Sequence, residues 1–494
     1  MFSLTPEYEQ LSLIEQIKNI NEFPNRNPVK FLELLEKNID LPALVPQSFY
    51  QAYYASKTNR RGYKLEPLLA ILLLMHFFKF SSVNNFTTLL LLAPKVQKFC
   101  RLGDDIPDDS VLSKFKTLFE NEIKLFFENL SLLVIDVFAG YNESLPDDSP
   151  HKGLNETVIK DTSGLKPKVK ENNPKTLESE VKRQTNYLKY LKSQGKGEGF
   201  DVYKAAFANM PKHAYANEAV RLGYANGHFG YFYKFGIITN GFGIPLHIDF
   251  MDKGFYEKLP LNYESPEDQK FAYDNASLRP VLSSFFDRIG SRRFSVFIGD
   301  SEFDSYDNFG YLRALGFSKV LIPINERNTP LPENKRDIPR NNENIPCCPK
   351  DTSMPFIPDG RCKGKNRSLR FKFVCPKSRK TNNAWVCECE DMCRKSNSTV
   401  TEYSYPVGDF RTFPGIQRGS TEWVNTYKIR TIIEREISSM KSHPALERPN
   451  TYNCASMRAD VYLNAAAKLI TVILAFAIGK PDYMRNLKKL LSVA

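Results

Sequence analysis

The stretch "VFIGDSEFDSYDNFGYLRALGFSKVLIPIN", residues 296–325, combines two short apolar segments with a mixed segment between them. The first apolar run belongs to "RFSVFIGD" (293–300) and ends on Asp300, and the second is "KVLIPIN" (319–325). Short runs rich in β-branched residues predict strands, and the segment 304–315 between them predicts a helix. We therefore expect strand, helix and strand in one sheet, with Asp300 where the first strand ends.

The segments before this stretch predict further strands. "ETVIKDTSGL" predicts a short strand that ends at Asp161 and is followed by small residues. Aromatic and β-branched runs in 230–252 flank Asn240-Gly241, a strong signal for a hairpin. The polar stretch 166–200 predicts a loop or an exposed helix. This order implies an α/β fold class, a mixed sheet with helices on its faces.

The composition is that of a basic, soluble globular protein. With 494 residues and 42% hydrophobic side chains, the chain can build two or three domains. A net charge of +12 predicts a polyanionic partner, nucleic acid before membrane, although a merely basic cytosolic protein has the same balance. The first residues lack the basic and apolar regions of a signal peptide, so we expect no export, and the apolar runs 68–78 and 469–478 are too short to span a bilayer. We expect a cytoplasmic protein with no membrane partner.

Residues 1–145 are expected to form a helical domain that binds DNA. Leu, Phe, Ile and Lys dominate this part, and apolar residues recur at helical spacing. Its segment 103–119 predicts a turn and a helix capped by Asp109 or Ser110, with Lys114 and Lys116 in the next turns. A short basic helix suits a DNA-reading element, and an ordinary packing helix is the alternative.

The rest of the chain is expected to form one catalytic domain with an insertion. Residues 146–326 supply its first part, and 404–494 continue it with an acid-bearing helix and the C-terminal helices. Residues 327–403 break the periodic pattern and are rich in Pro, Asn, Lys, Arg and Cys.

Seven of the nine cysteines lie in that insertion, and clustered cysteines in a protein that is not exported suggest zinc. No His lies among them, so a structural zinc site would use thiolates alone, and Cys389-x3-Cys393 has the spacing of a knuckle. Reduced thiols in a flap that contacts DNA are the alternative. The candidate ligands are Cys362, Cys375, Cys389 and Cys393; the other cysteines of the cluster are Cys347, Cys348 and Cys387.

A late helix, "TYKIRTIIEREISSMKSH" (426–443), carries two different faces. Tyr427, Arg430, Glu434 and Lys441 fall within about 60° of one another at 100° per residue. A separate apolar stripe would face a core. It consists of Ile429, Ile432, Ile433, Ile437 and Met440.

Three carboxylates are therefore candidates for one catalytic site. Asp161 and Asp300 at neighbouring strand ends would repel each other unless cations lie between them. A pair of Mg²⁺ ions (or Mn²⁺) about 3.5–4 Å apart removes that cost and can drive phosphodiester displacement. Glu434 would complete the oxygen ligands, since Glu436 faces the apolar side of the helix. A turn residue is the alternative for Asp161.

Other residues compete for these roles or join them. Glu302, Asp304 and Asp307 are alternatives to Asp300, and Asp304 is also expected to cap the next helix. Arg430 and Lys441 would bind phosphates, or be solvated charges, and Tyr427 would donate to a phosphate or stack on a base. Two tryptophans are candidates for stacking on bases, although hydrophobic anchoring is the favoured interpretation of each. They are Trp385 in the insertion and Trp423 beside the late helix.

The order of these motifs resembles one known family. The pattern Y-x2-R-x3-E-x6-K, met by Tyr427, Arg430, Glu434 and Lys441, is similar to the signature of a group of DDE transposases of bacterial insertion sequences. "VIKDTSGL" and the opening stretch resemble the segments around that family's two catalytic Asp residues, and "GDDIPDDSVLSKFKTLF" resembles its N-terminal helical module. The resemblance covers most of the chain except about 327–403.

The resemblance implies a ribonuclease-H-like core with Asp161 on the first strand, Asp300 on the fourth and Glu434 on a late helix. It implies nicking at element ends and joining of the 3′-OH to target DNA, often through a hairpin intermediate. The partners would be double-stranded DNA, namely terminal inverted repeats and target, and a second copy in a homodimer at the nucleoid.

Other functions have less support in the sequence. No G-x-x-x-x-G-K-[ST] or G-x-G-x-x-G loop is present, so NTP-driven and NAD-dependent chemistry lack a basis. A transposase-derived DNA-binding protein without cleavage is one alternative. A ribonuclease-H-like nuclease without strand transfer is another.

Overall fold

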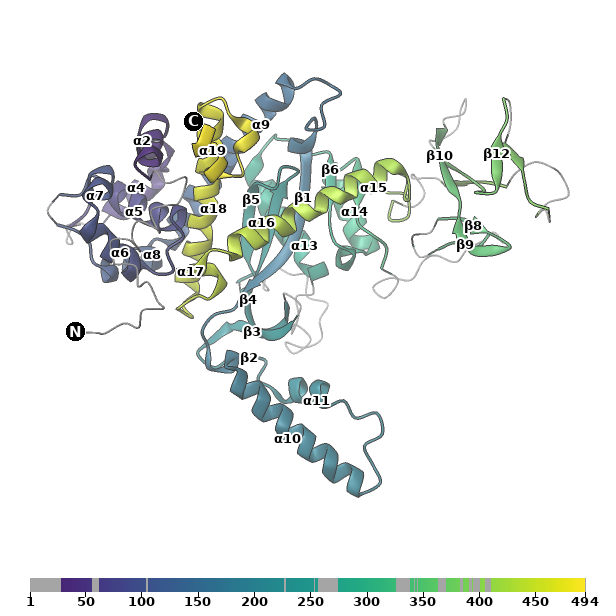
Figure 1. The fold of residues 1–494 in the computed structure, drawn as a ribbon, viewed down its shortest axis with the longest axis horizontal. Helices are drawn as coiled ribbons and strands as arrows, with labels where there is room; N and C mark the ends of the chain where they lie inside the picture. Colours follow the sequence, from purple (N-terminus) through teal and green to yellow (C-terminus); the bar gives the residue numbers. More distant parts are fainter. Residues whose placement is uncertain are drawn as a thin grey trace, which may run out of the picture.

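A curled mixed sheet lies between a helical N-terminal part and a group of short strands (Figure 1). The structure is a computed structural model. It describes residues 28–493 apart from 56–61, 104, 226–227, 253, 256–273, 326–337, 342, 344, 363–369, 383–384, 391–392, 394–399 and 405–409.

The N-terminal part is helical, as the apolar spacing predicts, although residues 1–27 lie outside the described ones. Its apolar run 68–78 lies in helix α5 up to Phe77, and nearly every side chain of this helix is buried. These helices bury one continuous aromatic and aliphatic core. Their bounds are α2 Pro28–Asn38, α3 Leu41–Leu44, α4 Gln47–Tyr54, α5 Leu65–Phe77, α6 Val83–Leu92, α7 Pro94–Phe99, α8 Asp109–Leu118 and α9 Glu120–Ser144.

Helix α18 (Cys454–Ala477) joins the N-terminal helices to the sheet. It contacts α5, α8 and α9 on one side and strand β5 on the other. The apolar run 469–478 is only part of this 24-residue helix, which is long and apolar enough to cross a membrane by length and composition. Because 83% of its most apolar window is buried inside the fold, it has the surroundings of a core helix.

The sheet contains parallel and antiparallel pairs, as expected. β1, β6 and β7 run parallel, whereas β4 pairs antiparallel with β1, β3 and β5. The order is β2-β3-β4-β1-β6-β7, with β5 also paired to β4. The strands are β1 Thr157–Leu165, β2 His213–Ala214, β3 Asn217–Ala225, β4 His228–Asn240, β5 Pro245–Phe250, β6 Val296–Ile298 and β7 Lys319–Leu321.

Alternation along the strands buries both faces of the sheet. Ile159 and Ile237 pack with α9 and α18, whereas Val158 and Ile238 pack with α13 (Asp274–Ile289) and α14 (Tyr306–Ala314). Successive side chains of a strand point to opposite faces, so one strand serves two cores. Helices on both faces agree with the expected mixed sheet, and α14 corresponds to the helix expected over 304–315.

Three features differ from the sequence expectations. β1 does not end at Asp161 but continues to Leu165, because the antiparallel pairing with β4 extends that far. The hairpin β2–β3 was not expected, and it makes β6 the sixth strand in chain order. The polar stretch 166–200, expected as a loop or an exposed helix, does contain an exposed helix, α10 (Pro174–Ser193); the helix that follows it, α11 (Val202–Asn209), was not expected.

The described parts of 338–404 form small sheets of their own, at one end of the molecule in Figure 1. The chain then returns to the main sheet: Lys319 of β7 and Glu422 of α15 (Thr421–Tyr427) form an ion pair at 2.7 Å. The short strands are β8 Cys347–Cys348, β9 Asp351–Pro355, β10 Ile357–Cys362, β11 Arg370–Val374, β12 Ser378–Lys380, β13 Trp385–Cys387 and β14 Thr401–Ser404.

The late helix begins at Thr421, before the predicted segment 426–443, and a 3₁₀ turn interrupts it. α15 leads into the single 3₁₀ turn η5 (Lys428–Arg430) and then into α16 (Thr431–Lys441), which crosses the sheet in contact with β1 (Figure 1). The predicted apolar stripe faces the core, with Ile433 and Met440 buried. Gly243, in the β4–β5 turn, has φ +73°, and a Cβ there would collide with Ile432. A glycine therefore lets α16 lie close to the sheet. The remaining helices are α17 Pro444–Glu447 and α19 Leu487–Val493.

Candidate functional site

The strand register places Asp161 beside Asp300. The parallel pairing of β1 and β6 aligns Ile159 with Ile298, and each Asp lies two residues further along its chain. Side chains two residues apart in a strand share a face, and paired strands lie about 4.8 Å apart. The two acids therefore approach each other although 139 positions separate them in the sequence.

Asp161 is held as a carboxyl that is difficult to ionise. Burial raises its pKa to about 6, and the nearby charge of Asp300 adds to this effect. The Thr162 N–H, which donates to Asp161 Oδ1 at 2.8 Å, together with Lys160 and Arg430, opposes the rise. Positive charge near Asp161 reduces the cost of ionising it in this buried position.

Arg430 joins the acids of the strands to the acid of α16. Its guanidinium donates to Asp300 Oδ2 at 3.2 Å and to Glu434 Oε1 at 2.6 Å. Burial opposes its charge, but Asp300 and the other groups around it raise the pKa of Arg430. Asp300 Oδ1 is occupied by the N–H of Ser301, so Asp300 also caps the short turn η4 (Ser301–Phe303).

The other two residues of the helix pattern belong to the same cluster. Burial lowers the pKa of Lys441 to about 8, and the charge of Asp161 partly offsets this. Burial raises the pKa of Tyr427 to about 12, and its hydroxyl lies in the field of Arg430 and Asp300. The structure thus brings Tyr427, Arg430 and Glu434 of the late helix together with Asp300, and Lys441 lies in the field of Asp161.

The carboxylates do not form a ready-made metal cage. Among the described residues, no three His, Cys, Asp or Glu side chains lie close enough together to hold a metal ion. Arg430 instead pairs with Asp300 and Glu434 and supplies positive charge there. The donor set is one of oxygens, which suits Mg²⁺ or Mn²⁺, but ligation by all three acids would require Arg430 to release two of them.

The competing acids have other roles. Asp304 was expected to cap α14, but Ser305 caps this helix instead. Asp304 is fully buried, and its carboxylate accepts from the guanidinium of Arg411 at 2.7 and 2.8 Å. Asp307 is exposed. Glu436 is buried on the opposite side of α16 and pairs with Lys468 at 2.6 Å, in agreement with its predicted orientation. Glu302 is exposed and lies in the turn that Asp300 caps.

Of the two lysines selected on α8, only Lys114 is exposed. Lys116 is buried and donates to both carboxylate oxygens of Asp460 on α18 at 2.7 Å, so its selection as a DNA contact was wrong. The cap of α8 is Asp108, which accepts from Ser110 N–H and Val111 N–H, and not Asp109 or Ser110.

The tryptophans anchor the fold more than they offer stacking surfaces. Trp423 is only 4% exposed, stacks on the ring of Tyr427 and lies beneath the guanidinium of Arg418. Its selection for base stacking was therefore wrong. Trp385 is partly exposed and donates from Nε1 to Asp359 at 3.1 Å.

The structure describes the side chains of three of the four candidate zinc ligands. The side chain of Cys362 lies outside the described residues, Cys375 is buried, and Cys389 and Cys393 are partly exposed. Burial raises the pKa of the thiols of Cys375, Cys389 and Cys393, which disfavours free thiolates. A structural zinc ion in this segment stays a prediction.

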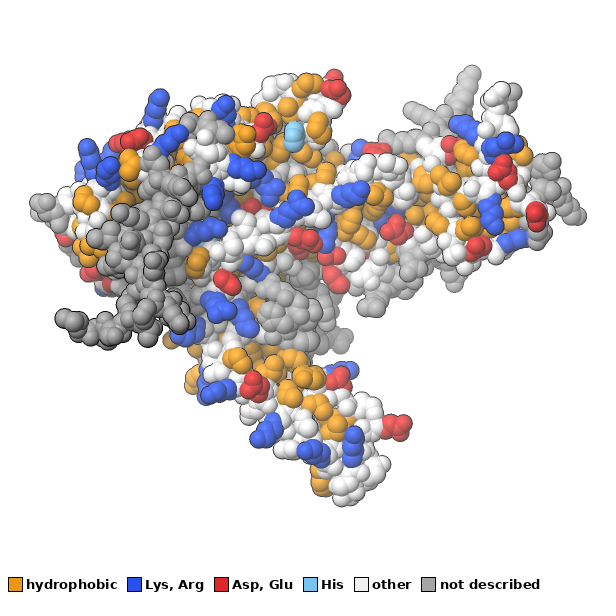
Figure 2. All heavy atoms as spheres, in the orientation of Figure 1, with side chains coloured by type: hydrophobic (Ala, Val, Ile, Leu, Met, Phe, Trp, Pro, Cys, Tyr) orange, Lys and Arg blue, Asp and Glu red, His pale blue; other side chains and the backbone are white. Residues whose placement is uncertain are grey.

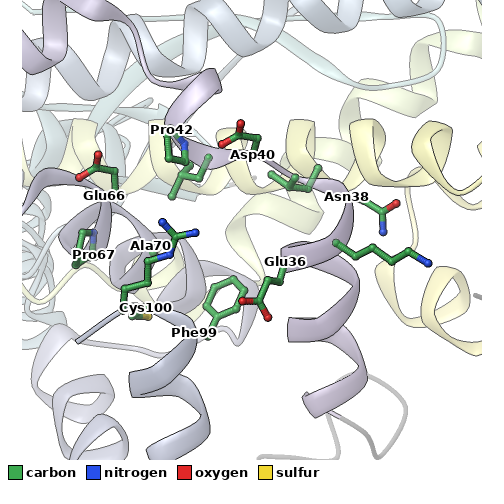
Figure 3. Close-up of a pocket in the computed structure, with 13 residues that line it drawn as sticks. Glu36, Asn38, Asp40, Pro42, Glu66, Pro67, Ala70, Phe99 and Cys100 are labelled. Atoms are coloured by element: carbon green, nitrogen blue, oxygen red, sulfur yellow. The ribbon is translucent and has the colours of Figure 1, made fainter. Parts of the chain in front are cut away.

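Of two hollows in the surface, one is lined by Glu434 of the acid cluster and the other is not. One of about 550 Å³ follows the exposed face of α16 and is lined by Glu434, Arg435, Thr431 and three serines. The other, of about 470 Å³, lies among the N-terminal helices, where Glu36, Asp40, Glu66 and Phe99 surround it (Figure 3). No residue of the acid cluster lines the second hollow, so only the first belongs to the site.

One supporting residue escaped the sequence reasoning. Lys160 is buried on the sheet face opposite Asp161, donates to Ser277 Oγ of α13 and lies 4.0 Å from the ring centre of Phe303. It ties β1 to the turn that Asp300 caps. The signal was a lysine at a core-facing position of an apolar strand, which the alternation of "TVIKD" contains.

Comparison with known proteins gives one match. Residues 19–118 match the family model of a transposase domain (DUF772), which spans the N-terminal helices through α8. No match was found among curated proteins or among solved structures. The match supports a transposase family and, with it, a function in processing DNA.

Proposed function

We propose that the chain is a DDE transposase that binds the ends of its element, hydrolyses phosphodiester bonds there and joins the 3′-OH to target DNA. The observation that carries this proposal is the in-register placement of Asp161 and Asp300 beneath the helix that carries Glu434. The sheet is mixed, with β1, β6 and β7 parallel and β4 antiparallel to β1, and it has helices on its faces, as the proposed ribonuclease-H-like core requires.

The acids of the cluster would hold two divalent cations, Mg²⁺ or Mn²⁺. Asp161, Asp300 and Glu434 offer the oxygen donors, and the raised pKa of Asp161 reflects an environment that favours a bound cation. When bound, such ions supply an activated water or hydroxyl and neutralise charge on the phosphate.

The remaining residues of the cluster would position the DNA. Arg430 balances Asp300 and Glu434 in the free protein, and it can move its bidentate fork from these acids to a phosphate. Lys441 and the hydroxyl of Tyr427 would contact neighbouring phosphates. The open hollow along α16 leaves space for a DNA strand beside Glu434.

The test is a plasmid that carries the DNA flanking the gene, incubated with Mg²⁺ and with EDTA. We expect Mg²⁺-dependent nicks with free 3′-OH ends, followed by joined products. Asp300→Asn should abolish both while leaving the mobility shift of the DNA unchanged. Asp307→Asn is the matched control, because Asp307 is exposed on α14 and pairs with Arg279 of α13 at 3.6 Å, and this variant should cut normally.

Other outcomes separate the alternatives. A mobility shift without nicks in the wild type would favour a transposase-derived DNA-binding protein. Nicks without joined products would favour a nuclease on the same fold. Loss of cutting in Asp307→Asn but not in Asp300→Asn would overturn the choice of acids.

A further inference from the structure

Residues 166–212 form an arm that projects from the sheet. α10 and α11 pack against each other and extend away from the rest of the molecule (Figure 1). α10 has 20 residues and is therefore about 30 Å long. Neither the acid cluster nor the residues matched to the transposase domain include any part of this arm.

Both ends of the arm are fixed to one residue of the sheet. The Asn172 side chain bonds both backbone groups of Tyr231 in β4, each at 2.9 Å. The Tyr231 hydroxyl donates to the carbonyl of Pro211 at 2.6 Å. The arm thus leaves and re-enters the fold at one rigid point, and its direction is set by the sheet.

The arm is strongly basic. It contains eleven Lys or Arg and five Asp or Glu, a net charge of +6 out of +12 for the whole chain. Arms that serve only to pack would gain nothing from this excess, whereas a duplex carries one phosphate charge per about 1.7 Å of its axis.

The basic residues are ordered along α10. Lys175, Lys182 and Lys189 are all exposed and recur every seven residues, so they form one stripe about 21 Å long. The buried Gln184 marks the opposite face, toward α11. Arg183, beside the stripe, is instead paired with Glu180 at 2.9 Å.

Two exposed tyrosines lie on α10 to one side of this stripe. Tyr187 and Tyr190 are 49% and 60% exposed, with ring centres 6.4 Å apart, and Figure 2 shows Lys and Arg side chains interspersed with hydrophobic ones on the visible face of the arm. Tyrosine hydroxyls are regular donors to DNA phosphates.

We propose that the arm is a DNA-binding element, whose lysine stripe lies along the sugar–phosphate backbone of duplex DNA that enters the acid site. β1 connects the two sites directly, because Asp161 lies four residues, or about 13 Å, before the last residue of the strand. The inference rests on the proposed function for the identity of the duplex, and it assigns no base recognition to the arm.

The salt dependence of DNA binding tests this assignment. Lys175→Gln, Lys182→Gln and Lys189→Gln are combined in one variant, and its affinity for a 40-base-pair duplex is measured between 50 and 200 mM salt. Losing three phosphate contacts should reduce the slope of log affinity against log salt by about 2 to 3. The control replaces three exposed lysines at the C-terminal end, Lys480, Lys488 and Lys489, by Gln, and it should keep the wild-type slope.

A second variant removes the arm itself. Residues 174–209 are replaced by a short Gly-Ser linker, which the common anchor on Tyr231 permits. This variant should show the same reduced slope. Unchanged slopes in both variants would overturn the proposal, as would a change from dimer to monomer on excision with an unchanged slope, which would identify the arm as an interface between copies.

Nicking is scored separately, so that the two proposals can fail independently. Suppose that the wild type and all variants bind DNA, that none of them cuts it, and that only the arm variants show a smaller slope of log affinity against log salt. The arm proposal then stands and the catalytic proposal fails. If all cut and no slope changes, the arm proposal fails alone.

Discussion

Replacing Asp161 by Asn should make the protein more stable, although the same change removes a proposed metal ligand. Burial raises the pKa of this carboxyl from 3.8 to about 6. At about 1.4 kcal/mol per pKa unit, the ionised side chain costs about 3 kcal/mol relative to the unfolded chain. Asn is neutral, and its oxygen can still accept the Thr162 N–H that Asp161 now accepts at 2.8 Å.

The sign of the pH dependence follows from the raised pKa. Below about pH 4 the carboxyl is protonated in both states, so the substitution should change nothing. The cost develops as the pH rises through 4 to 6 and is complete above about 6, where the folded protein also carries the charge. We expect a gain of about 3 kcal/mol at pH 7.5 and about half of that at pH 5.

Urea unfolding at the two pH values, followed by tryptophan fluorescence, measures this gain. Asp300→Asn is the control: it removes a partly exposed ion pair with Arg430 and the repulsion of Asp161, two small opposing effects, so stability should change by less than about 1 kcal/mol. Mn²⁺ should stabilise the wild type and not Asp161→Asn. Equal or lower stability of Asp161→Asn at pH 7.5 would refute the argument that this site stores unfavourable charge.

Three further predictions follow from the same contacts. Lys116→Ala should lose about 3–5 kcal/mol of unfolding free energy in urea, because it leaves a buried carboxylate unpaired, whereas Lys114→Ala on the same helix should change it by less than about 0.5 kcal/mol. Because burial lowers the pKa of Lys441 to about 8, wild-type DNA affinity should fall between pH 7.5 and 9; Lys441→Arg should hold its affinity in the same titration, and parallel curves would contradict this. Glu434→Gln should abolish nicking without loss of stability, whereas Glu436→Gln should lower the thermal midpoint and still cut; the reverse pattern would exchange their roles.

The strand and helix periods predicted which acids lie close together and which side chains of the late helix share a face. Asp161 and Asp300 each follow an apolar run, and such runs become neighbouring strands whichever loops join them. Glu434 was distinguished from Glu436 by helix geometry alone, because 3.6 residues per turn fixes which side chains share a face.

The errors came from contacts that connect distant parts of the chain. Lys116 has the spacing of a surface lysine on α8, but its partner Asp460 lies on α18, 344 positions away. Trp423 is covered by Arg418, and Asp304 was selected as a helix cap although a distant arginine neutralises it. Local pattern gives the face of an element, and only packing decides whether that face meets water.

The proposed catalytic role of the acids can be tested without knowing the DNA substrate. Fe²⁺ takes the place of Mg²⁺ in oxygen-ligand sites, and with ascorbate and peroxide it cuts the nearby backbone, so that mass spectrometry of the fragments locates the ion. We predict cuts close to residues 161, 300 and 434, suppressed by excess Mg²⁺ and lost when Asp161 and Asp300 are both replaced by Asn. Cuts elsewhere, or cuts that persist in the double variant, would contradict a divalent-cation site at these acids.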